Sequence, residues 1–143
     1  MLTKGALSCA WGAPPNERKR KKRMEQSFTI NQSLMTLNEY TRLNRTAFVV
    51  GAKAKKEQQD IIHWYLLSAR LAPIEGAIHA EFYWTLKNRR KDIDNVAFAQ
   101  KFIFDALVEN GTLKDDSQKY LKGFSHYFEI GKEDSVKVIL KEI

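Results

Sequence analysis

Several residue types are scarce in this chain, and each scarcity excludes a class of protein. The 143 residues include one cysteine, Cys9, which excludes an internal disulfide and a cysteine-based zinc site and indicates a reducing compartment. Seven glycines and three prolines are too few for collagen-like or low-complexity sequence. No run of about 20 apolar residues occurs, so we expect no membrane-spanning helix and a cytoplasmic location.

Motifs for nucleotide binding are also missing. The chain contains no P-loop, no G-x-G-x-x-G and no G-x-S-x-G, so neither a nucleotide cofactor nor serine-hydrolase chemistry is expected. The three histidines, His63, His79 and His126, lack metal-ligand spacing and are predicted to be structural or on the surface. A hydrophobic content of 43% and a charged content of 29% indicate instead a folded protein with a core of its own.

Most of the net charge of +7 lies near the N-terminus. Residues 1–23 hold seven lysines or arginines and one glutamate, whereas residues 24–143 are close to neutral, so the overall charge is weak support for nucleic-acid binding. We predict a disordered basic leader over 1–23 and one folded domain over 24–143. Three interpretations of the leader stay open: a DNA- or RNA-binding arm, a nuclear address, or sequence upstream of a true start at Met24.

Hydrophobic periodicity predicts an α/β (α+β) fold with a small mixed β-sheet and two main helices. Residues 36–48 have no steady period and are predicted to form a loop, with a strand end at Val49 and Val50. Residues 77–87 alternate between apolar and polar side chains, which is typical of a half-buried strand. The remaining predictions are strands at 27–30, 120–130 and 135–143, helices at 51–71 and 95–109, and a turn at 131–134.

An acidic segment, Asp92-Ile93-Asp94-Asn95, lies between the predicted strand and the second helix. In an extended segment Asp92 and Asp94 point to the same side and Ile93 turns into the core, while Asp94 or Asn95 supplies the helix N-cap. Two carboxylates 4 Å apart repel each other by about 4 kcal/mol at an effective dielectric constant near 20, which a divalent cation would offset.

A second acidic pair, Asp115-Asp116, follows the second helix and can return to the first. Oxygen ligands without histidine or cysteine suit Mg²⁺ or Mn²⁺, ions that support phosphodiester hydrolysis. Lys101 lies two helical turns after Asp94, where it can hold a phosphate or stabilise the transition state. The alternative is that Asp94 is only an N-cap, that the later pair are turn residues, and that Lys101 pairs with Asp105.

These residues resemble the RusA family of Holliday junction resolvases, of the phage and prophage type. The resemblance rests on a basic run leading into D-I-D-N at 92–95, on Lys101 and the string F-D-A-L at 104–107, and on the later D-D at 115–116. It implies a homodimeric α/β endonuclease of a bacterial host cell that nicks four-way DNA junctions with Mg²⁺ or Mn²⁺ during DNA recombination and repair.

The resemblance also implies roles for individual residues. Asp92, Asp94 and Asp116 become the catalytic, metal-binding carboxylates, Lys101 becomes the catalytic lysine, and Asp115 matches the first member of the family's D-D pair. One departure is a longer interval between Asp94 and Lys101, which moves the lysine along its helix. That departure motivates the alternative of a branched-DNA-binding module without cleavage; a third interpretation is a small interaction protein with an incidental acidic cluster.

Basic side chains near the proposed site are predicted to contact DNA phosphates, which orient the protein without reading sequence. The alternative for each is an ordinary solvated surface. A first group lies directly before the acidic segment and a second lies around the start of the first helix; the predicted contacts are Lys87, Arg89, Arg90, Lys91, Lys53, Lys55, Lys56 and Arg42.

Overall fold

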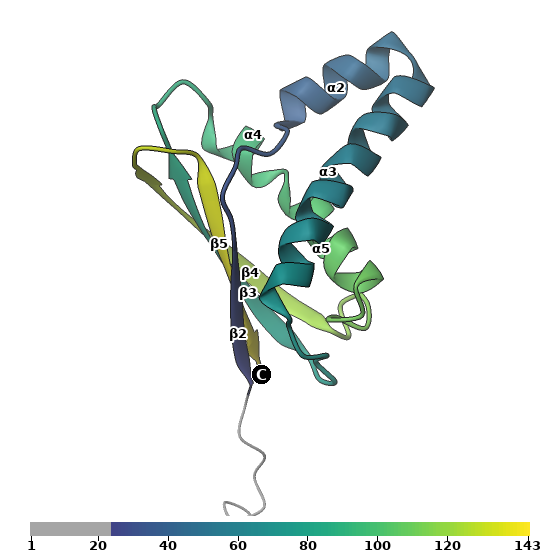
Figure 1. Cartoon of the computed structure of the whole chain (residues 1–143), viewed down its shortest axis with the longest axis vertical. Helices are drawn as coiled ribbons and strands as arrows, with labels where there is room; N and C mark the ends of the chain where they lie inside the picture. Colours follow the sequence, from purple (N-terminus) through teal and green to yellow (C-terminus); the bar gives the residue numbers. More distant parts are fainter. Residues whose placement is uncertain (1–23) are drawn as a thin grey trace, which may run out of the picture.

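The computed structural model describes residues 24–143, so the predicted leader over 1–23 lies outside the described residues (Figure 1). The fold is α+β with a mixed four-stranded sheet, as the sequence predicted. The elements follow one another as β2 (Glu25–Ile30), α2 (Leu37–Thr46), α3 (Phe48–Ala69), β3 (Ile78–Leu86), α4 (Ile93–Ala97), α5 (Gln100–Glu109), β4 (Leu121–Ile130) and β5 (Ser135–Glu142).

The sheet has the strand order β2-β5-β3-β4, which places the last of these strands in sequence between β2 and β3. Strand β5 pairs antiparallel with both neighbours, whereas β3 and β4 are parallel. Parallel neighbours need a long crossover, and α4 and α5 supply it. The predicted turn at 131–134 carries the chain around the end of β3, where the Gly131 N–H donates to the Leu86 carbonyl at 2.9 Å.

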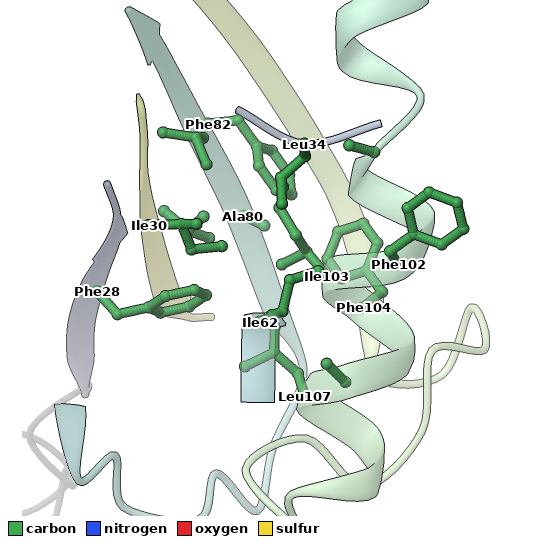
Figure 2. Close-up of a cluster of buried hydrophobic side chains, with 14 of the residues drawn as sticks. Phe28, Ile30, Leu34, Ile62, Ala80, Phe82, Phe102, Ile103, Phe104 and Leu107 are labelled. Carbon is green, nitrogen blue, oxygen red and sulfur yellow. The ribbon is translucent and has the colours of Figure 1, made fainter. Parts of the chain in front are cut away.

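The core lies between the sheet and helices α3 and α5 (Figure 1). Figure 2 shows Phe82 of β3 directed toward the α5 side chains, and its ring meets Phe104 edge-on with centroids 5.5 Å apart. The alternation predicted for β3 is confirmed, because every second residue of the strand is buried. Among the described residues, no helix is both long and apolar enough to cross a membrane.

Helix α2 occupies the segment for which the sequence predicted a loop, so that prediction was wrong. Thr36 and Glu39 form a capping box, in which Thr36 Oγ1 accepts from the Glu39 N–H at 3.3 Å and Glu39 accepts from the Thr36 N–H at 2.9 Å. The predicted strand end was also wrong, since Val49 and Val50 lie in the first turn of α3. Hydrophobic periodicity did not reveal this helix because α2 has no buried residue and therefore no apolar stripe.

The second predicted helix, over 95–109, is in fact two helices. The Ala99 N–H donates to Val96 and the Lys101 N–H donates to Phe98, so tight three-residue spacing interrupts the α-helical pattern between α4 and α5. The predicted end of the second helix is confirmed by the Asn110 C-cap and by Gly111, whose φ of 84° is in the left-handed region that favours glycine.

His126 on β4 is half-buried and structural, as predicted. The Trp84 indole N–H donates to His126 Nδ1 at 2.9 Å, and Nε2 lies 2.8 Å from Gln100 Oε1 at the start of α5. Because an indole N–H only donates, Nδ1 accepts and the neutral ring carries its proton on Nε2. Burial lowers the pKa of His126 below its ordinary value, which favours this neutral form.

Candidate active site

The first acidic pair lies in an open groove beside the predicted basic run. Asp92 is the N-cap of α4 and Asp94 lies in its first turn, and both side chains are exposed. Together with Arg89 and Lys91 they line a groove of about 540 Å³, whose other side is the end of β4 at Phe128, Glu129 and Ile130. The prediction that the acidic segment and the basic run lie side by side therefore agrees with the residues that line this groove.

The local geometry of this pair differs from the expected one. Helix α4 begins at Ile93, so Asp92 keeps extended backbone but Asp94 lies in a helix rather than in an extended segment. Ile93, expected in the core, is 56% exposed, and the predicted N-cap at Asp94 or Asn95 is replaced by Asp92. Asp94 instead accepts a hydrogen bond from the Asn95 N–H at 2.9 Å, whereas the Asp92 carboxylate has no hydrogen bond or ion pair with any residue of 24–143.

Lys101 lies at the start of α5 between two carboxylates. Its Nζ is 3.1 Å from Asp105 Oδ1 and 3.4 Å from Asp116 Oδ2. The pairing with Asp105, four residues later on the helix, is the contact expected in the alternative interpretation of Lys101, and the contact with Asp116 joins two of the predicted site residues. The hydrogen bond that Lys101 donates to Asp105 raises the pKa of Lys101, so the side chain stays an ammonium and cannot act as a base near neutral pH.

Asp105 is a site neighbour that the sequence reasoning did not select. Its Oδ2 lies 3.5 Å from Lys55 Nζ and 3.4 Å from Gln59 Nε2, so this carboxylate joins α5 to α3 as well as holding Lys101. A signal was present in the four-residue spacing from Lys101, which predicted the pair. The contact of Asp105 with α3 depends on helix packing and could not be predicted from residue spacing.

The predicted aspartates divide between two grooves. Asp116 lines a second groove of about 310 Å³ with Lys55, Gln59 and Asp105, while Asp92 and Asp94 line the first. Within residues 24–143 no three histidine, cysteine, aspartate or glutamate side chains are close enough together to hold one metal ion. Asp115 is exposed and accepts from the Asp116 N–H at 2.9 Å.

The first groove nevertheless offers carboxylate ligands of the kind that Mg²⁺ and Mn²⁺ prefer. These ions are commonly bound through one or two protein carboxylates while water and phosphate oxygens complete the shell. Asp92 and Asp94 offer two exposed carboxylates, of which Asp92 has no competing partner in the described part of the chain. These two residues have the ligand chemistry that a hydrated divalent ion would need, whereas Asp116 lines the second groove.

Some side chains of the basic run before the acidic segment bind other residues of 24–143, and others form no ion pair there. Lys91 Nζ donates to Ser33 Oγ at 3.0 Å and lies 3.6 Å from Asp134 Oδ2, which ties this loop to two neighbouring segments. Burial opposes ionisation of Asp134, but hydrogen bonds from the Lys87 N–H and from Ser33, with the Lys91 charge, outweigh it and lower the pKa. The exposed side chains of Lys87, Arg89 and Arg90 form no ion pair with another described residue.

The predicted contacts on α2 and α3 divide in the same way. Lys55 pairs with Asp105, and Lys56 lies 3.5 Å from Asp60 Oδ1 on the same helix. Arg42 and Lys53 are exposed and have no ion pair among residues 24–143. Among the predicted DNA contacts, those without an ion pair to another of residues 24–143 therefore lie at the α2–α3 corner and in the loop before α4.

Comparison with known protein families and curated proteins identified no relative of this chain. No protein-family model matches the chain, and no curated protein matches it. The resemblance to RusA resolvases thus stays a prediction from the motifs, and the functional argument depends on the two grooves and the charges around them.

Proposed function

We propose that this protein is a structure-selective endodeoxyribonuclease that resolves four-way DNA junctions by paired, metal-dependent nicks in DNA recombination and repair. The observation that carries the proposal is the open groove in which Asp92 and Asp94 lie beside Arg89 and Lys91. Carboxylates with adjacent cations serve both requirements of phosphodiester cleavage, a site for a divalent ion and a hold on the phosphate. The motif resemblance supports the same reaction.

Each side chain has a distinct role in this proposal. Asp92 and Asp94 would hold the Mg²⁺ or Mn²⁺ ion, which when bound activates water and neutralises charge at the scissile phosphate. Arg89, which has no partner in the described structure, would grip a backbone phosphate through its planar fork of donors. Lys101 would supply fixed positive charge rather than accept a proton, and Asp116 would position it. Two symmetric nicks need two such sites, so the proposal includes a homodimer.

A nicking assay on a synthetic four-way junction tests this proposal. Wild-type protein, Asp92→Asn and Glu25→Gln are compared with Mg²⁺, Mn²⁺ or EDTA, beside a linear duplex of the same arms. Glu25 is the matched control because it is an exposed carboxylate on β2, at the sheet edge opposite β4. We expect symmetric nicks on the junction alone, and an approximately 100-fold loss in Asp92→Asn with binding retained. Wild-type nicking by Asp92→Asn would refute the mechanism.

A second candidate function is a branched-DNA-binding module without cleavage. The observation in its favour is that Asp116 lines the second groove rather than the first and forms an ion pair with Lys101. Such a protein would bind junctions equally with metal and with EDTA and would nick in neither. Absence of junction binding at physiological salt would contradict both candidates and favour a protein-interaction role.

A further inference from the structure

The corner between α2 and α3 exposes an apolar tip that the proposed nuclease site does not use. Phe48 is 84% exposed and Val49 is 73% exposed, more than any other large apolar side chains of residues 24–143. In Figure 1 this corner projects from the body of the protein, at the same end as the loop before α4 and away from the end marked C. Two adjacent apolar side chains at a projecting tip contribute little to the core.

The tip is built on a well-supported corner. Ala47 ends α2 and begins α3 with extended backbone, so the two helices join through a single residue. Gly51 is buried, and a methyl group there would collide with the Asn44 side chain, which shows how closely the helices approach. Tyr40 anchors α2 on the crossover, with its ring 5.7 Å from Phe98 and 5.6 Å from Phe102.

Positively charged residues flank this tip in the sequence, on both helices. Residues 40–56 include five lysines or arginines and no aspartate or glutamate. Arg42 and Arg45 on α2 and Lys53 on α3 are exposed, and none has an ion pair with another described residue. A collar of free cations contributed by two helices is complementary to a polyanion on either side of the apolar tip.

We propose that Phe48 and Val49 form an apolar wedge that inserts between unstacked bases at the branch point of DNA, while Arg42, Arg45 and Lys53 bind the flanking phosphates. The inference rests on the proposed function and adds a source of selectivity to it. Apolar side chains flanked by cations open base steps in this way in other DNA-bending proteins. A branch point offers stacking already weakened, so the wedge inserts there at lower cost than in a continuous duplex.

The chemistry of the corner favours DNA over a lipid surface. A helix that lies on a membrane presents an apolar face along several turns, whereas here the apolar side chains occupy one turn at Phe48, Val49 and Val50. The α2–α3 corner and the loop before α4 lie at the same end of the molecule (Figure 1), and each carries cations without an ion pair among the described residues. One branched DNA could therefore meet both groups.

The test uses the full chain in EDTA with a four-way junction that carries 2-aminopurine at the branch. Wild type is compared with Phe48→Ser/Val49→Ser and with the control Trp64→Ser/Leu67→Ser. The control removes two exposed apolar side chains from the same helix, at 63% and 60% exposure, outside the cationic collar. Junction affinity, duplex affinity and fluorescence are measured at several salt concentrations, and circular dichroism checks that each variant is folded.

We expect wild type and the control to raise 2-aminopurine fluorescence, and the tip variant to lose that rise and about tenfold in junction affinity, with duplex affinity unchanged. A tip variant that keeps the rise and the junction preference would overturn the inference. Junction binding by wild type without any rise would overturn it while leaving the proposed function intact, and no DNA binding at all would overturn both.

Two further measurements test other occupants of the tip. Flotation with phosphatidylcholine–phosphatidylserine vesicles and sedimentation velocity are run on wild type and on the tip variant. Loss of vesicle binding or of self-association in the tip variant, with junction binding unchanged, would assign Phe48 and Val49 to a membrane or to a second copy and overturn the inference.

Discussion

Replacing His126 by leucine tests how much its contacts with Trp84 and Phe82 contribute to the stability of the fold. The substitution removes the acceptor of the Trp84 indole N–H, which lies in a side chain only 3% exposed, and a buried donor without a partner costs about 1–3 kcal/mol. It also removes the stacking of the imidazole on Phe82, with centroids 4.7 Å apart, for about 0.5–1.5 kcal/mol more. Leucine has a similar volume, so we expect a total loss of about 1.5–4.5 kcal/mol.

Urea unfolding of four proteins measures this loss: wild type, His126→Leu, Trp84→Phe and the double variant. If the unpaired indole N–H carries the cost, His126→Leu is less destabilising in the Trp84→Phe background, where no N–H needs an acceptor. His126→Asn is a further control, because its side-chain carbonyl can stand in for Nδ1. Equal losses in both backgrounds, or a total below about 0.5 kcal/mol, would refute the reasoning.

Two more predictions follow from contacts in the fold. Because burial lowers the pKa of His126, the unfolded chain takes up its proton more readily; stability is therefore full above the ordinary pKa of 6.5 and falls as the pH drops below it. The free energy of unfolding, measured between about pH 5 and 7, should decrease with falling pH in wild type, and this decrease should be absent in His126→Leu. Thr36→Ala should cost about 1 kcal/mol and reduce helical circular dichroism, whereas Thr36→Ser should keep the cap.

The sequence predicted best those elements whose pattern is set by burial on one side. Strand β3 alternates because one face meets the helices and the other does not, and this alternation is visible in the residues. Helix α2 has no buried residue and therefore no apolar stripe to detect, although Thr36 and Glu39 marked its start. The break between α4 and α5 accompanies the packing of Tyr40 on Phe98, a contact between segments far apart in sequence.

The candidate site was predicted in the same uneven way. Adjacent residues in sequence stay adjacent in space, so Asp92, Asp94 and Arg89 were expected together and line one groove. The contact of Lys101 with Asp116 depends on how the loop after α5 returns, which no spacing rule fixes. Whether Asp116 joins the metal-binding residues in catalysis stays a prediction.

The central place of β5 has a consequence for how the chain acquires its fold on the ribosome. Strands β2 and β3 have no contact with each other in the sheet and are joined only through β5, which is synthesised after both. A nascent chain that ends before residue 135 can form the helices and the β3–β4 pair and can pack β2 against α3, but it cannot join β2 to the sheet. Completion of the sheet therefore waits for residues 135–142 and depends on long-range pairing, which is slow relative to helix formation.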